Sequence, residues 1–184
     1  MIFKADGNVK LEMLMHYIIW KCKDPTTLGA TKLNKSLLYS DIFSYIELGK
    51  SITEVSYIKR QFGPVPNPKD FLQAKEKLQN EGKIAITKNL YHGMPQHQFV
   101  ALERPDISMF TPEEISIADI VIEEMCQKYT ASSMSELSHD IIWEAAEIGE
   151  EIPLHAFFAS RIGEINEGDI QWAKSQAKQL GMGH

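Results

Sequence analysis

The sequence predicts a single, mainly helical α+β domain of about six helices with a small antiparallel β-hairpin. Several segments repeat apolar residues every three to four positions, which is typical of helices that bury one face. Capping residues, prolines and glycines mark the ends of those segments. The chain of 184 residues is the natural length for one domain, and we expect the domain to span residues 1–184 with its core at residues 9–158.

Two long helices are expected in the first third of the chain. The first covers residues 8–23 and ends at Asp24 and Pro25, because proline breaks a helix. The second covers residues 30–48 and ends at Gly49, where a left-handed residue stops a helix. Residues 51–62 are then expected to be extended.

A helix with two clear end signals follows a proline-rich turn at residues 63–66. Asn67 is a good N-cap and Pro68 suits the first helical position, so we expect the helix to begin there and to close near Gly82. Residues 83–87 and 98–102 alternate apolar and polar side chains, which predicts the two strands of the hairpin.

The remaining helices begin at capping patterns. Residues 111–114 form a capping box with proline at the first helical position, ahead of an apolar stripe at residues 115–125. A short helix is expected from Ser133 toward Trp143, residues 148–161 are expected to be a connection, and a last helix is expected over about residues 166–181.

Charge is distributed unevenly along the chain. The net charge is −6, but residues 1–105 carry +5 and residues 106–184 carry −11. An acidic surface in the second half would suit a basic protein partner, although a solvated acidic face explains the same charges without any partner.

Cys22 and Cys126 lie far apart in the sequence and form no CxxC pair, so reduced thiols in the core are the favoured interpretation, with a single disulfide left open. The sequence has no long apolar run near its start and no stretch of about 18 apolar residues. We therefore expect a cytoplasmic protein with no membrane partner.

Motifs for catalysis, cofactors and metals are absent from the sequence. The six histidines show no zinc-ligand spacing, and His92 and His97 are read as solvated loop residues. No GxxxxGK[ST], GxGxxG or GxSxG segment is present. We predict no catalytic, cofactor-binding or metal-binding residues, and no enzyme.

A winged-helix-like DNA-binding regulator is the first alternative, because a helix followed by a β-hairpin occurs in the basic half of the chain. Nucleic acid is nevertheless not the favoured partner, since the whole chain is acidic. The cations that would meet phosphates are Lys59, Arg60, Lys69, Lys75, Lys77, Lys83 and Lys88.

The segment KLNKSLLYSDIFSYIELGK and the pentad that follows it carry a family resemblance. The first motif set comprises Lys32, Leu33, Leu37, Leu38, Tyr39 and the turn Phe62-Gly63-Pro64-Val65-Pro66, and the second comprises Leu137-Ser138-His139 and Trp143. In this order they resemble the Panacea domain, the SocA-like antitoxin domain of toxin–antitoxin pairs in bacteria and phages. The resemblance covers about residues 9–158.

This resemblance implies a function through protein binding. Such a protein would neutralise a cognate protein toxin by direct contact. At least one member of the family also delivers its toxin to an ATP-dependent protease, so a protease is a second partner that the resemblance allows. Tyr39, Phe62 and Trp143 are favoured as core aromatics rather than as exposed anchors. His139 and Trp143 would share one helix face. The exposed aromatic residues predicted to bind the partner are Tyr91, Phe110, Phe157, Phe158 and Trp172.

Overall fold

A computed structural model describes residues 7–91, 94–130, 132–133, 143–144 and 146–159 of the chain. In order, its labelled elements are α1 (Gly7–Lys21), α2 (Ala30–Leu48), β1 (Tyr57–Ile58), β2 (Val65–Pro66), α3 (Pro68–Asn80), β3 (Ile84–Tyr91), β4 (Met94–Ala101), α4 (Pro112–Gln127), β5 (Glu151–Ile152) and α7 (Leu154–Ala159). The predicted α+β class with a small hairpin is confirmed. The last predicted helix, at residues 166–181, lies outside the described residues, as does nearly all of the one predicted from Ser133 to Trp143.

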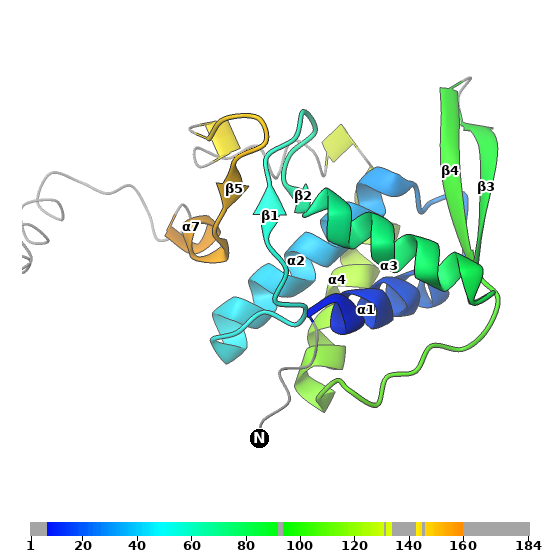
Figure 1. Ribbon diagram of the computed structural model, residues 1–184, viewed down its shortest axis with the longest axis horizontal. Helices are drawn as coiled ribbons and strands as arrows, with labels where there is room; N and C mark the ends of the chain where they lie inside the picture. Colours follow the sequence, from blue (N-terminus) through cyan, green and yellow to red (C-terminus); the bar gives the residue numbers. More distant parts are fainter. Residues whose placement is uncertain (1–6, 92–93, 131, 134–142, 145, 160–184) are drawn as a thin grey trace, which may run out of the picture.

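Helix α2 lies at the centre of the core (Figure 1). It packs against α1, α4, α7 and strand β2, while α1 also packs against α3. Its apolar side chains Leu33, Leu37 and Leu38 are fully buried. Burying each such side chain stabilises the fold by roughly 1.5–3 kcal/mol relative to leaving it exposed.

The predicted helix ends are confirmed by their backbone geometry. Gly49 has φ +72° and donates its N–H to the Tyr45 carbonyl, which ends α2. The Asn67 side chain accepts the Lys69 N–H at 3.0 Å at the start of α3. Thr111 and Glu114 form a complete capping box at the start of α4. These ends are set by local chemistry, which is why the sequence reveals them.

Strand β1 joins two segments that are far apart in the sequence. It pairs antiparallel with β2, through Tyr57 with Pro66, and with β5, through Tyr57 with Ile152. The prediction that residues 148–161 form only a connection is therefore wrong, because they include β5 and α7. A strand of two residues is too short to show alternation, and its pairing is decided by the tertiary fold.

The hairpin β3–β4 extends beyond the strands expected from alternation. Its register runs from Ile84 opposite Ala101 to Tyr91 opposite Met94. Pairs such as Asn89 with Gln96 are polar on both strands, so apolar alternation stops before backbone pairing does. The hairpin stands at one edge of the helical core (Figure 1).

Cys22 and Cys126 form a disulfide, so the favoured prediction of reduced thiols is wrong and the alternative that the sequence left open holds. Their Cα atoms lie 6.5 Å apart although 104 positions separate them in the sequence. Cys22 directly follows α1 and Cys126 lies in the last turn of α4. Spacing in the sequence cannot reveal that these two helix ends meet.

No helix within the described ranges is both long and apolar enough to cross a membrane. Nor do the described residues include a cluster of three or more His, Cys, Asp or Glu side chains that could hold a metal ion.

Candidate partner-binding site

The motif turn, residues 60–66, links strands β1 and β2 and is closed by its own backbone. Gly63 has φ +95° and donates its N–H to the Arg60 carbonyl at 3.0 Å. A residue with a side chain is strained in this left-handed conformation, so glycine is the residue that the turn requires. Pro66 then pairs with Tyr57, which aims the chain into α3.

A buried lysine on α2 forms a hydrogen bond with this turn. The Lys35 side chain, in the first half of α2, is almost fully buried and donates to the Pro64 carbonyl at 3.1 Å. Burial lowers the pKa of Lys35 to about 7. Burial also lowers the pKa of Lys32, one helical turn earlier. No carboxylate within the described residues forms an ion pair with either lysine.

Trp143 joins the second motif region to the same turn. Its indole N–H donates to the Arg60 carbonyl at 3.1 Å. The Lys59 ammonium lies 4.2 Å from the centroid of the Trp143 ring and donates to the Ala146 carbonyl at 2.8 Å. A cation on the face of a tryptophan is attracted by the negative ring face, so Lys59, directly after β1, holds Trp143 and Ala146 in place. Trp143, from the second motif set, therefore contacts the turn of the first.

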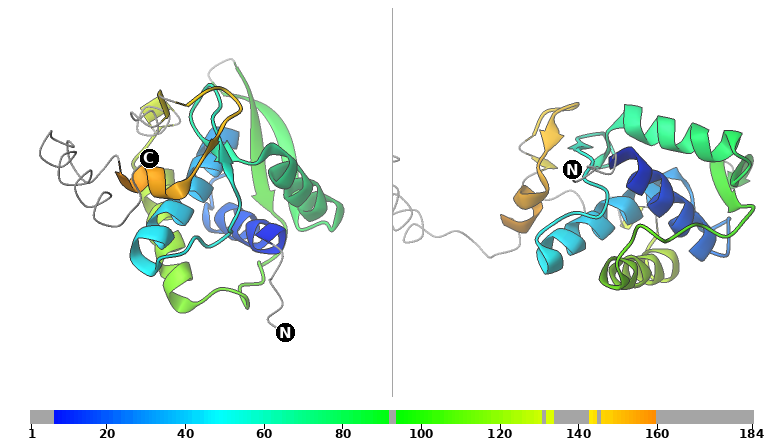
Figure 2. Two further views of the ribbon diagram at one scale, coloured as in Figure 1. Left: turned by 60° about the vertical axis from the view of Figure 1, so that its left-hand side comes forward. Right: turned by 60° about the horizontal axis from the view of Figure 1, so that its bottom comes forward.

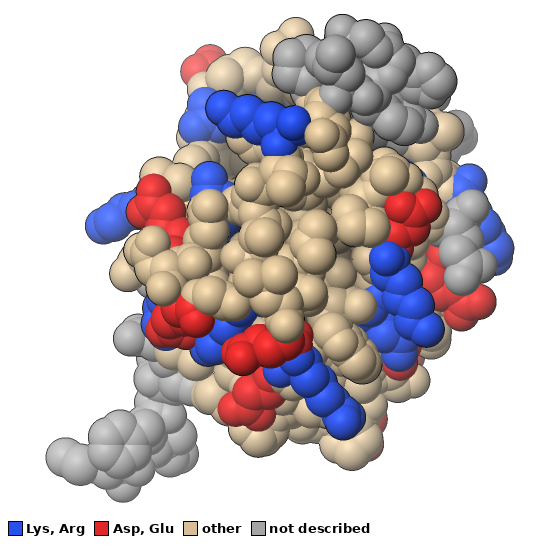
Figure 3. Space-filling view, turned by 90° about the vertical axis from the view of Figure 1, so that its right-hand side faces the viewer, with Lys and Arg blue, Asp and Glu red and all other residues tan. Residues whose placement is uncertain are grey.

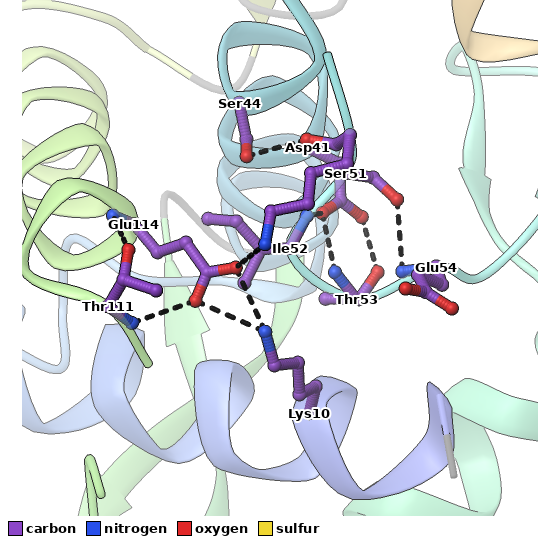
Figure 4. A network of polar contacts seen from close by, with 10 residues as sticks. Lys10, Asp41, Ser44, Ser51, Ile52, Thr53, Glu54, Thr111 and Glu114 are labelled. Atoms are coloured by element: carbon purple, nitrogen blue, oxygen red, sulfur yellow. Dashed lines mark hydrogen bonds and ion pairs between the residues drawn. The ribbon is translucent and has the colours of Figure 1, made fainter. Parts of the chain in front are cut away.

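A buried carboxylate on α2, Asp41, holds the segment that leads into β1 (Figure 4) and, through Tyr57, β1 itself. Asp41 accepts the backbone N–H groups of Ile52 at 2.8 Å and Thr53 at 2.9 Å, together with the Thr53 hydroxyl and the Tyr57 hydroxyl. Burial raises the pKa of Asp41 above its ordinary value, and these hydrogen bonds offset only part of that rise. Burial and the adjacent carboxylate raise the pKa of Tyr57 well above its ordinary value, so Tyr57 remains a donor.

A second carboxylate in the same view fixes α4 against α1. The fully buried Glu114 side chain accepts the Thr111 N–H at 3.0 Å and both its oxygens contact the Lys10 ammonium, at 2.9 and 3.1 Å. Lys50 approaches the same carboxylate at 3.9 Å. Glu114 therefore belongs to the helix cap and to the core.

Comparison with protein families identifies this arrangement. Residues 33–144 match the family described as antitoxin SocA-like, Panacea domain. The chain belongs to the SocA-like Panacea antitoxin family. Significant matches were found neither among curated proteins nor among solved structures.

The matched part of the Panacea domain begins in α2 and ends next to Trp143, so it contains the turn, the hairpin and the contact between Lys59 and Trp143. The resemblance predicted from the motifs is thereby confirmed. Helix α1 precedes the match but packs on α2 and α3, and it supplies part of the same core.

Three of the predicted motif residues on α2, Leu33, Leu37 and Tyr39, are buried in the Panacea core as expected. Phe62 is not: its side chain is 61% exposed at the tip of the motif turn, so its prediction as a core aromatic is wrong. The tight turn at Gly63 projects the preceding side chain outward. Trp143 is partly buried against the core, and His139 lies outside the described residues.

Of the predicted partner-binding aromatics, Phe157 is buried in the core, so its expected exposure is wrong. It packs there because residues 154–159 form a helix, α7, against α2. Phe110 is half-buried, with the Lys10 ammonium 5.8 Å from its ring centroid. The side chains of Tyr91, Phe158 and Trp172 lie outside what the structure describes, and their roles stay predictions.

Three of the seven cations considered for DNA contact have partners within the protein. Lys77 pairs with Glu12 at 2.7 Å, Lys83 pairs with Glu81 at 2.6 Å, and Lys59 is buried against Trp143. On the face that carries the hairpin, acidic side chains lie among the lysines and arginines (Figure 3). A continuous basic patch, which phosphate binding needs, is not present on this face.

Sequence reasoning did not single out Lys35 and Asp41. A signal was present for both, since each is a charged residue inside the apolar pattern of α2. Their partners, Pro64 for the lysine and residues 52–57 for the aspartate, lie on segments that only the tertiary fold brings to α2.

Proposed function

We propose that this Panacea domain is an antitoxin that neutralises a cognate protein toxin by binding it directly. Membership of the antitoxin family over residues 33–144 carries this proposal. The chain acts without catalysis, by covering a surface that the toxin needs.

The motif turn is the first contact that we propose. Phe62 presents a large apolar surface, and the turn beneath it is fixed by the Gly63, Lys35 and Trp143 hydrogen bonds. An aromatic side chain on a rigid support suits an interface anchor, because little conformational entropy is lost when the partner binds.

Growth rescue with co-purification tests the proposal. The adjacent small open reading frame is expressed alone and together with this chain, and the two products are tested for elution as one complex. We expect toxicity alone, and rescue with a stable complex when both are present. A harmless neighbour, or a toxic neighbour that is neither rescued nor bound, would contradict the antitoxin function.

A pair of matched variants tests the contact at the turn. Phe62 and Leu102 are exposed to nearly the same extent, 61% and 59%, on different segments. Phe62→Ala should weaken toxin binding by at least roughly tenfold, which is typical of an anchor residue, while Leu102→Ala should leave it unchanged. Equal effects of the two variants would remove the turn from the interface.

The lifetime of the toxin in these cells reveals whether the complex is also delivered to a protease.

A further inference from the structure

A second apolar surface lies between the last turns of α2 and the first half of α4, two helices that pack side by side (Figure 2). It is a groove of about 440 Å³ whose apolar lining is Phe43, Leu48, Ile117, Ile120 and Val121. This volume lies within the range of about 300–1,000 Å³ that is common for occupied pockets. None of the described residues that line it belongs to the Asp41 hydrogen bonds or to the motif turn.

Helix α4 is apolar on two sides. The side formed by Ala118, Ile122 and Met125 is buried in the core. The other side includes Ile120, which is 60% exposed at the groove. Ile120 and the partly exposed Ile117 therefore give α4 apolar surface outside its buried stripe, and this surface lies beside the groove.

The described lining of the groove includes two acidic residues, Glu47 and Glu113, and no basic one. Helix α4 has five acidic residues and no basic one. Glu114, Asp119 and Glu124 are paired with Lys10, Lys21 and Lys128.

Glu47 and Glu113, which line the groove, form no ion pair within the described part of the chain. Lys50, just beyond the end of α2, has its ammonium 3.9 Å from Glu114. The negative charge at the groove is therefore available to a partner.

We propose that this groove binds an amphipathic helix of the cognate toxin, with its apolar stripe on Ile120 and its basic flanks beside Glu47 and Glu113. A helix in a groove buries apolar side chains at every third or fourth position, and the two acidic side chains select lysine or arginine beside that stripe. This inference rests on the proposed antitoxin function and adds the chemistry of the partner segment.

The test compares four variants of the full chain for binding to the purified toxin. Ile120→Asp puts a charge into the groove. Its control, Leu72→Asp, puts a charge outside the groove, at a leucine on α3 that is 45% exposed. Glu47→Lys reverses a charge at the groove, and Glu76→Lys reverses one at an exposed glutamate of α3. We expect Ile120→Asp to weaken binding at least tenfold and Glu47→Lys several-fold, with both α3 controls unchanged. All four positions are exposed or at a surface groove, and thermal melts verify that each variant is folded.

A peptide arm separates this inference from the proposed function. The probe is a synthetic helix of about 18 residues with one leucine stripe and lysine elsewhere, and its partner probe has the same stripe with glutamate. The basic peptide should bind the wild-type chain, less at high salt, and should lose binding to Ile120→Asp, whereas the acidic peptide should not bind.

The two arms give distinct outcomes. Rescue by the wild-type chain with full toxin binding by Ile120→Asp would overturn the groove and leave the antitoxin function standing. Failure of wild-type rescue would overturn the antitoxin function, and with it the toxin as the occupant of the groove. Equal binding of both peptides, or binding that Ile120→Asp leaves unchanged, would overturn the stated preference for a basic helix.

Discussion

Two buried charges on α2, Asp41 and Lys35, are treated very differently by the fold. Asp41 receives four hydrogen bonds from Ile52, Thr53 and Tyr57. Lys35 donates to one carbonyl, that of Pro64. A buried charge with a full set of partners fastens segments together, whereas a buried charge with few partners reduces stability. Asp41 therefore stabilises the fold, whereas burial of the Lys35 charge reduces its stability.

The largest effect is expected from Asp41→Ala. It leaves two backbone N–H groups and two hydroxyl groups buried without their acceptor, so the free energy of unfolding should fall by about 3 kcal/mol or more. Urea unfolding measures the loss. Asp24→Ala, at an exposed carboxylate that caps a loop turn, is the control and should cost less than about 1 kcal/mol. A loss at Asp41 no greater than that at Asp24 would break the comparison.

Lys35→Met tests the cost of the buried lysine through the pH dependence of the free energy of unfolding. The folded pKa of about 7 lies below the ordinary value of 10.5, so between these values the unfolded chain binds more protons at Lys35 than the folded chain. The free energy of unfolding of the wild-type chain should therefore rise with pH in this window, by about 1 kcal/mol per pH unit.

Methionine should remove this rise, and at pH 7 it should destabilise the fold by only about 1 kcal/mol, because it loses the hydrogen bond to the Pro64 carbonyl but no ion pair. Urea unfolding at several pH values measures the difference between the two proteins, with Lys69→Met on the exposed face of α3 as the control. If Lys35→Met were destabilised as strongly as Asp41→Ala, Lys35 would also be a residue that stabilises the fold by holding segments together.

Tyr57→Phe sharpens the comparison by removing one donor of the four at Asp41. The loss of the hydroxyl hydrogen bond, 2.8 Å long, should lower the free energy of unfolding by about 1 kcal/mol. Thermal or urea unfolding measures it. If the loss matched that of Asp41→Ala, a single hydrogen bond rather than the full set would hold β1 to α2.

The smallest effect is expected from Trp143→Phe. Phenylalanine keeps an aromatic face for Lys59 but cannot donate to the Arg60 carbonyl, so we expect a loss of about 0.5–1 kcal/mol. Proteolysis between residues 130 and 150 should become faster if this contact holds the second motif region to the turn. An unchanged cleavage rate would show that the Lys59 contacts suffice.

Much of the helical fold was predictable from local signals. The ends of α2, α3 and α4 depend on Gly49, Asn67 and the capping box at Thr111, which act on neighbouring backbone groups. The family motifs were equally readable, since they are short and lie in a fixed order. The predictions of side-chain exposure were wrong at two aromatic residues. Phe62 was expected in the core and is exposed, whereas Phe157 was expected at the surface and is buried, and only the tertiary fold decides between these outcomes.

By itself, the sequence determined helices α1 to α4, the hairpin and the resemblance to the Panacea family, because caps, turns and periodicity act over a few residues. The tertiary structure alone decided the contacts between distant segments. The bond between Cys22 and Cys126, the cluster of Lys59 with Trp143, and the strand β5 each join positions more than 80 residues apart. Such contacts form when apolar faces pack in three dimensions, and no local pattern records which faces will meet.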